Sequence, residues 1–166
     1  RNIHYGDIHT KFGAHFRVSA EHVPYINDGA QHPAIRHENY CAIGDMVFAD
    51  ASEDTNDIGK AIEVVDAGGV PLVAGLQTIL AKPVSTSVVA GFGAYLFSSA
   101  GVRRQIQREG QGAKVLGLSP KRLANVRLRY PEEPSEQEKI VDCLSSLDVC
   151  IVAESRKLDV LNAHKQ

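Results

Sequence analysis

Histidines are the residues that most directly suggest chemistry in this chain, because six of the seven lie before residue 38. The six are His4, His9, His15, His22, His32 and His37. Zinc takes His, Cys or carboxylate ligands, often at short fixed spacings. None of these histidines belongs to an HExxH or CxxC-type pattern, so a metal site would need ligands assembled through space. The sequence favours the alternative, which is scattered loop histidines able to hydrogen-bond to phosphates and bases.

Basic side chains concentrate in one segment of an otherwise acidic chain. Residues 1–100 carry six Lys and Arg against eleven Asp and Glu, and residues 131–166 carry four against eight. Residues 101–130 carry one acidic residue, Glu109, against eight basic ones: Arg103, Arg104, Arg108, Lys114, Lys121, Arg122, Arg127 and Arg129. Such a segment is typical of a protein that binds a polyanion. The alternative is a solvated face with cations near helix C-termini.

Sequence signatures of common enzymes are absent. No GxGxxG follows a predicted strand, and neither GxxxxGK[ST] nor GxSxG occurs. Asp50, Ser52 and Asp54 have the spacing that opens a calcium loop. That loop needs Gly at its sixth position and Glu at its twelfth, where this chain has Thr55 and Ala61. The sequence therefore predicts no catalytic residues, no metal and no cofactor.

The elements that must position these side chains are short. Apolar runs bounded by Gly, Pro and polar residues predict strands, and a longer periodic run with one apolar face predicts a helix. The predicted strands are residues 3–8, 46–49, 61–65, 72–81, 115–118 and 126–130, the helix is 88–109, and a single helical turn follows Ser119-Pro120. These strands and helices occupy residues 1–131, in front of the last stretch of the chain.

The last stretch of the chain predicts one long helix over residues 134–166. Pro134 ends the preceding segment, and Ser135 with Glu138 forms a capping box. Apolar residues then recur at steps of three and four: Ile140, Leu144, Leu147, Ile151, Leu158 and Leu161. About 30 residues make a helix of roughly 45 Å. A narrow apolar seam on such a helix favours a coiled-coil partner, and the alternative is packing on its own domain.

The length of the chain and its cysteine content restrict the classes of protein to which it can belong. The 166 residues suffice for one hydrophobic core, and no apolar run is long enough to cross a bilayer. Cys41, Cys143 and Cys150 lack metal-type spacing and indicate a reducing compartment. The chain begins with Arg1 rather than Met, and a strand is predicted from Ile3 onward, so we expect an N-terminally incomplete domain.

These features together favour a DNA-binding module. In DNA recognition, Lys and Arg contact phosphates while a few polar side chains contact base edges. A dimerising helix sets the distance between two recognition domains and hence between two half-sites. The candidate phosphate contacts are Arg103, Arg104, Arg108, Lys114, Lys121 and Arg122, and the candidate base contacts are His9, Lys11, His15, Arg17 and Gln77. For each basic residue the alternative is a solvated surface charge.

An ordered set of short motifs resembles the DNA-specificity subunit of type I restriction–modification systems. The motifs are GDIHTKF (6–12), GDMVFADASED (44–54) with Gly59-Lys60, AGLQTILAKP (74–83), FGAYLFSSAGVRRQI (92–106), GAKVLGLS (112–119), the 126–131 segment and PSEQEKIVDCLSSLD (134–148). The last is similar to the family's PxxEQxKI helix opening. The resemblance spans nearly the whole chain. It departs at Gln77, where relatives commonly have His in a GLHT-like stretch.

The resemblance implies one half of such a subunit: a target-recognition domain over residues 1–131, followed by a spacer helix over residues 134–166. The implied fold of the domain is α/β, with a mixed, mostly antiparallel sheet and packed helices. Whole subunits usually carry two halves whose long helices pair antiparallel, and they bind methyltransferase and restriction subunits that perform the chemistry. It therefore implies a cytoplasmic, non-enzymatic protein of a bacterium or archaeon that contacts half of a bipartite double-stranded DNA target. Here the helix would pair with a second half-subunit or a second copy. Two alternatives are an assembly scaffold without DNA specificity and a restriction enzyme with its own nuclease.

Overall fold

The computed structural model describes residues 1–26, 35–84 and 88–163. Its elements in chain order are β1 (Asn2–Ile3), α1 (Tyr5–Thr10), β2 (His15–Arg17), the 3-10 helix η1 (His37–Asn39), β3 (Met46–Ala49), β4 (Ala51–Ser52), β5 (Ala61–Asp66), β6 (Val73–Ala74), β7 (Thr78–Ala81), α2 (Phe92–Ser98), α3 (Ala100–Glu109), β8 (Leu116–Gly117), α4 (Pro120–Leu123) and α5 (Pro134–Ala163). The predicted α/β class with a long C-terminal helix is confirmed.

A four-stranded sheet forms the centre of the domain, with strand order β2-β5-β3-β7. β2 pairs parallel with β5, while β3 pairs antiparallel with both β5 and β7. The sheet is therefore mixed and mostly antiparallel, as predicted. Two smaller pairings lie beside it: β1 runs parallel to β6, and β4 runs antiparallel to β8.

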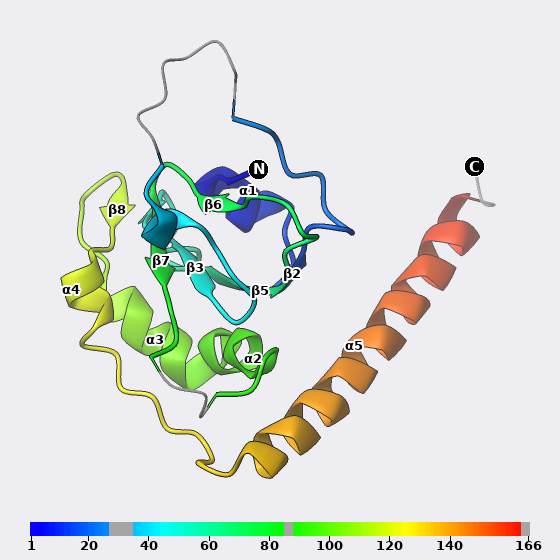
Figure 1. Cartoon of the computed structure of the whole chain (residues 1–166). Coiled ribbons are helices and arrows are strands. Elements are labelled where there is room, and N and C mark those ends of the chain that lie inside the picture. The colour runs from blue at the N-terminus through cyan, green and yellow to red at the C-terminus, as the bar shows by residue number, and fades with distance from the viewer. Residues whose placement is uncertain (27–34, 85–87, 164–166) are drawn as a thin grey trace.

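Both faces of the sheet are covered, because alternate residues of its central strands point to opposite sides. Val47 and Ile62 pack with Ile8 of α1 in one core. Met46 and Phe48 pack in a second core, which includes residues of α3. Figure 1 shows α2 and α3 below the sheet and α1 on its other side. The run of residues with no polar break in β3 reflects this two-sided burial.

The predicted strand over residues 3–8 is wrong beyond Ile3. Residues 5–10 form the six-residue helix α1, in which the His4 side chain accepts a hydrogen bond from the Gly6 N–H and caps the first turn. Asp7 lies in that first turn and pairs with Lys11 at 2.6 Å. These local polar contacts stabilise a helix too short to show apolar periodicity.

Three further element predictions need correction. The predicted strand over residues 72–81 is two strands, β6 and β7, which a turn at Leu76 and Gln77 separates. The predicted helix over residues 88–109 is two helices, since Ser99 has an extended backbone (φ −62°, ψ 141°) and ends α2 where α3 begins. The predicted strand over residues 126–130 is not a strand in the structure. Gln105 of α3 holds this segment instead, because its side chain accepts from the Arg127 N–H at 2.9 Å and donates to the Arg127 carbonyl at 3.0 Å.

The long helix α5 runs away from the domain (Figure 1). It begins at Pro134, and the Glu133 carbonyl accepts from the N–H groups of Glu136 and Gln137. The predicted capping box is therefore wrong, because Ser135 lies inside the first turn rather than before it. Proline suits a first helical position, where no N–H partner is needed. Among the described residues, no helix has the length and apolar character needed to cross a membrane.

Candidate nucleic-acid interface

The two neighbouring arginines of α3 have different environments. The Arg103 guanidinium turns inward and donates to the carbonyls of Gly59 at 2.7 Å and of Asn56 and Ile58 at 2.8 Å each. Burial lowers the pKa of Arg103. Arg104 is exposed, and its Nε donates weakly, at 3.2 Å, to the Ala100 carbonyl of its own helix. Arg103 thus holds the loop before β5, whereas Arg104 faces solvent.

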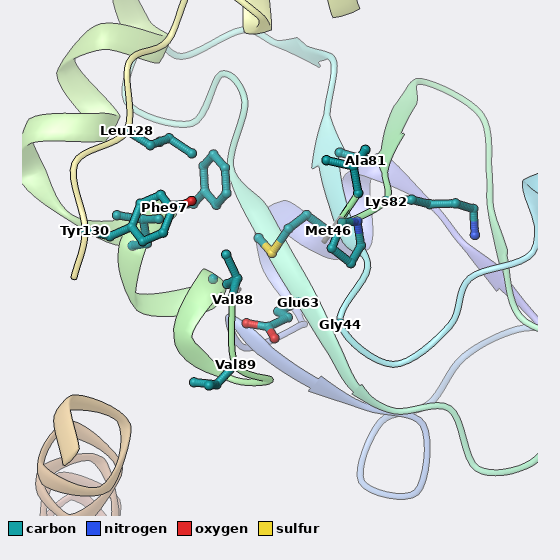
Figure 2. A pocket seen from close by; sticks show the side chains of 14 residues that line it. Gly44, Met46, Glu63, Ala81, Lys82, Val88, Val89, Phe97, Leu128 and Tyr130 are labelled. Atoms are coloured by element: carbon teal, nitrogen blue, oxygen red, sulfur yellow. The ribbon is translucent and has the colours of Figure 1, made fainter. Parts of the chain in front are cut away.

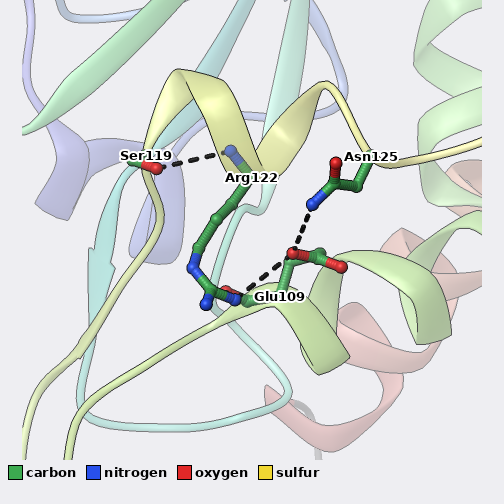
Figure 3. Close-up of polar contacts among 4 residues, drawn as sticks. All are labelled: Glu109, Ser119, Arg122 and Asn125. Atoms are coloured by element: carbon green, nitrogen blue, oxygen red, sulfur yellow. Dashed lines mark hydrogen bonds and ion pairs between the residues drawn. The ribbon is translucent and has the colours of Figure 1, made fainter.

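The helix α4 carries one exposed and one internally paired cation. The Ser119 side chain caps α4 by accepting from the Arg122 N–H, and Lys121 is exposed. Arg122 Nη1 lies 3.3 Å from Glu109 Oε2, and Asn125 Nδ2 donates to the same oxygen at 3.0 Å (Figure 3). The sole acidic side chain of residues 101–130 therefore joins the end of α3 to α4 and engages Arg122.

Exposed cations remain on α3, on α4 and on the segments next to them. They are Arg104, Arg108, Lys114, Lys121, Arg127 and Arg129, which we call the basic surface. None of the six has an ion-pair partner among the residues that the structure describes. Arg127 and Arg129 extend the surface beyond the residues predicted to contact phosphates. Unpaired, exposed cations on adjoining elements are the arrangement that phosphate binding uses.

The two candidate base-contacting histidines lie between elements of the fold. His9 Nε2 is 2.9 Å from the Ala51 carbonyl of β4, and its buried Nδ1 has no hydrogen-bond partner among the described residues. His15 Nε2 is 2.8 Å from the Gly91 carbonyl, and its ring contacts the Tyr95 ring edge-on with centroids 4.5 Å apart. Both rings therefore make internal contacts that position α1 and β2. The predicted histidine His32 lies outside the described residues.

The remaining candidate base contacts lie in separate places. Lys11 pairs with Asp7 on α1, and Arg17 is exposed at the end of β2. Gln77 precedes β7, which is the opposite edge strand of the sheet from β2. Lys11, Arg17 and Gln77 are thus exposed, and the fold places Gln77 and Arg17 at opposite edges of the sheet.

Gln77 lines an open polar cleft of about 540 Å³. The other polar side chains of the cleft belong to Asp50, Gln111, Ser119 and Arg122. Gln77 has a left-handed backbone (φ 55°), which is uncommon outside glycine and recurs at functional sites. Burial raises the pKa of Asp50. Asp50 and Gln111 were not predicted, because the pairing of β4 with β8 that unites them leaves no sequence signal.

A second, apolar cavity of about 280 Å³ lies between α2 and the sheet. Figure 2 shows the Glu63 carboxylate near Val88 and Val89 and close to the sulfur of Met46. Glu63 is 2% exposed and accepts from the N–H groups of Gly91 at 2.5 Å and Ala94 at 2.8 Å. Burial raises the pKa of Glu63, while the hydrogen bonds from Gly91 and Ala94 act in the opposite direction. This carboxylate fixes the N-terminus of α2 on β5, a structural role that sequence reasoning missed.

The six predicted helix-pairing residues divide into two groups. Ile140 and Leu144 are half-buried at the start of α5. The other four are largely exposed: Leu147 54%, Ile151 63%, Leu158 60% and Leu161 60%. Val149, Val152 and Val160 are also exposed, on other sides of the same helix. The part of α5 beyond Asp148 thus leaves apolar side chains uncovered by the described domain.

Hydrogen bonds of Gln137 and Asp148 fix the beginning of α5 on the domain. Gln137 is fully buried, and its side chain accepts from the Val89 N–H at 3.0 Å and donates to the Pro131 carbonyl at 2.8 Å. The Tyr95 hydroxyl donates to the Asp148 carboxylate at 2.7 Å. The first turns of the helix are therefore held against α2 and the loop before it.

Among the described residues, no group of three or more His, Cys, Asp and Glu side chains is arranged to hold a metal ion. No protein-family model matches the chain, and no curated protein matches it either.

Proposed function

We propose that this chain is the DNA-recognition half of a type I restriction–modification specificity subunit, without enzymatic activity of its own. One observation carries the proposal: a domain whose exposed cations have no ion-pair partner among the described residues continues into a long helix whose far half has an exposed apolar seam. The ordered motifs that resemble the family support the same assignment.

The basic surface supplies the sequence-independent part of DNA affinity. Its cations neutralise phosphates and release counterions, which makes binding weaken as salt concentration rises. Polar side chains near that surface supply base contacts. The contacts of Gln137 and of Tyr95 with Asp148 attach the first four turns of α5 to the domain. A spacer between two half-sites requires such an attachment.

The exposed seam of α5 is the surface that binds the second half of the assembly. Leu147, Ile151 and Leu158 follow the spacing of a coiled-coil seam and are more than half exposed in the described structure. A second spacer helix, from another half-subunit or a second copy, covers them. The remaining exposed apolar residues of the helix provide area for the methyltransferase subunit.

The test uses the chain co-purified with the methyltransferase subunit from its own cell. We expect the complex to bind duplex DNA with an affinity that falls steeply with salt, and to methylate a bipartite sequence in mapped genomic DNA. The chain alone should not cleave DNA in the presence of divalent metal. Failure of the complex to bind DNA, or cleavage by the chain alone, would overturn the proposal.

A scaffold function is the second candidate, favoured by the extent of exposed apolar surface on α5. A scaffold would form the helix-dependent complex with the methyltransferase but show no preference among DNA sequences. The same mapped methylation data separate the two functions, because a scaffold leaves no fixed sequence around the modified base.

A further inference from the structure

The polar cleft that Gln77 lines is formed by segments far apart in the sequence. The Asp50 N–H donates to the Gln77 carbonyl at 3.0 Å, and the Leu118 N–H donates to the Asp50 carbonyl at 2.7 Å. These main-chain bonds fix the turn before β7, the start of β4 and the end of β8 against one another. The walls of the cleft are therefore rigid, as specific recognition requires.

One wall of the cleft is a narrow projection of residues 111–117. Gln111 and Gly117 close its base with two reciprocal main-chain hydrogen bonds, of 3.0 Å and 2.7 Å. Lys114 and Val115 lie between these ends and are exposed. The segment between these bonds is a loop, and the major groove of DNA, about 12 Å wide, is wide enough for protein segments to reach base edges.

The cleft presents hydrogen-bonding groups that the fold does not use. The amide side chains of Gln77 and Gln111 are exposed and have no hydrogen-bond partner within the described part of the chain. The Asp50 carboxyl lies in the same cleft and can accept from an amino group. Arg122 also lines the cleft, but its guanidinium is engaged by Glu109. The cleft therefore offers two amides and one carboxyl to a ligand, and the guanidinium that lines it is already engaged.

Cations flank this cleft. Lys114 lies on the projection and Lys121 lies on α4, next to the cleft residue Arg122, and both are exposed. Phosphate contacts by flanking lysines position a protein on the duplex, while groups between them reach base edges. The cleft is therefore placed where base contacts are expected if the basic surface meets the DNA backbone.

We propose that this cleft binds the major-groove edge of an adenine, with Gln77 as the main contact and Gln111 and Asp50 beside it. This inference rests on the proposed DNA-binding function. Adenine presents an N7 acceptor beside an N6 amino donor, and a Gln amide matches both with one donor and one acceptor. Asp50 accepts from an amino group and repels the O6 acceptor of guanine. Guanine is recognised mainly by Arg or Lys; the cleft's arginine is paired with Glu109, and we assign the flanking Lys114 and Lys121 to phosphates.

The experiment selects bound sequences from a randomised duplex library with the methyltransferase-bound chain. Gln77→Gly is the informative variant, because glycine adopts φ near 55° without strain while the amide is removed. Gln111→Ala keeps the main-chain bonds to Gly117. Leu76→Ser is the matched control, since Leu76 is 72% exposed in the same turn and does not line the cleft.

We expect the parent chain and Leu76→Ser to enrich the same sequence, and Gln77→Gly to lose the preference for adenine at one position. Replacing that adenine by 7-deazaadenine, which lacks the N7 acceptor, should weaken parent binding by about tenfold or more and leave Gln77→Gly binding unchanged. An unchanged sequence preference in Gln77→Gly, or equal sensitivity of both proteins to 7-deazaadenine, would refute adenine recognition by the cleft alone. Lack of any enriched sequence with the parent chain would refute the proposed function as well.

Discussion

The Tyr95 hydroxyl donates a hydrogen bond of 2.7 Å to the Asp148 carboxylate and so joins α2 to the long helix four turns from its beginning. Tyr95 also contacts the His15 ring, whose Nε2 lies 2.8 Å from the Gly91 carbonyl. Asp148 is thereby connected through Tyr95 to the edge strand β2. The angle between domain and helix depends on this connection together with buried Gln137.

Ionisation of Tyr95 should be shifted to high pH. Burial and the adjacent Asp148 carboxylate raise the pKa of Tyr95 to about 12 from 10.0. The folded state therefore holds the phenolic proton more tightly than the unfolded state, so this contribution to stability is complete below pH 10 and is lost between pH 10 and 12. Absorbance titration should show a late tyrosinate transition that Tyr95→Phe removes and Asp148→Asn moves to lower pH. An unchanged titration in Asp148→Asn would contradict the contact.

Gln137 should be the most sensitive position of α5. Truncation by Gln137→Ala removes a fully buried side chain and leaves the half-buried Val89 N–H and Pro131 carbonyl without this partner; an unsatisfied group costs up to about 1–3 kcal/mol. We expect the free energy of unfolding to fall by about 2–4 kcal/mol in chemical denaturation. Glu136→Ala is the control, because Glu136 is exposed in the adjacent position, and its effect should stay within about 0.5 kcal/mol.

Periodic segments were predictable from the sequence, whereas side-chain direction was not. The runs of β3 and β5 and the length of α5 follow from local apolar patterns. Arg103 and Arg104 are the same residue type in adjacent positions, yet the carbonyls that bind Arg103 are 44 to 47 residues away in the chain. No local pattern contains that information.

The candidate site, too, was only partly predictable from the sequence. Gln77 was predictable by its chemistry, but Asp50 and Gln111 join it only because β4 pairs with β8 across more than sixty residues. Glu63 looked like a strand residue among apolar neighbours, and its partners Gly91 and Ala94 lie 28 and 31 residues later. The short helix α1 was missed because Gly6-Asp7 indicates a turn, while its cap depends on His4.

Arg103 and Arg104 provide a matched pair of test substitutions, because one side chain is engaged internally and the other is exposed. Arg103→Ala removes the donors to three loop carbonyls, so we expect the free energy of unfolding to fall by about 2–3 kcal/mol. Arg104→Ala should change stability by less than about 0.5 kcal/mol. In DNA binding by the methyltransferase complex, Arg104→Ala should flatten the slope of log affinity against log salt by about one. The same slope for Arg104→Ala and parent would remove Arg104 from the phosphate contacts.

Glu63 should make stability depend on pH in the direction opposite to a salt-bridged carboxylate. Burial raises its pKa above the ordinary 4.5, so the unfolded state releases the proton first as pH rises. The contribution of Glu63 to the free energy of unfolding is therefore largest below pH 4.5 and falls as pH rises through the pKa of the folded state. The stability difference between parent and Glu63→Gln, measured by denaturation from pH 4 to 7, should move in favour of the variant as pH rises. A difference independent of pH would contradict this assignment.

The exposed seam of α5 should drive self-association of the isolated chain. Leu147 and Ile151 are 54% and 63% exposed and lie on one side of the helix, where a second copy can cover them. We expect the parent chain to sediment as a dimer, and the double variant Leu147→Asp/Ile151→Asp as a monomer, because charges in a buried seam remain unpaired. Val149→Asp/Val160→Asp is the matched control, since those residues lie on the opposite side of the helix and carry the same change in charge. It should remain dimeric. Dissociation of both double variants would show that the pairing is not confined to the predicted seam. A monomeric parent chain would exclude self-pairing, so that α5 would need a helix from another half-subunit.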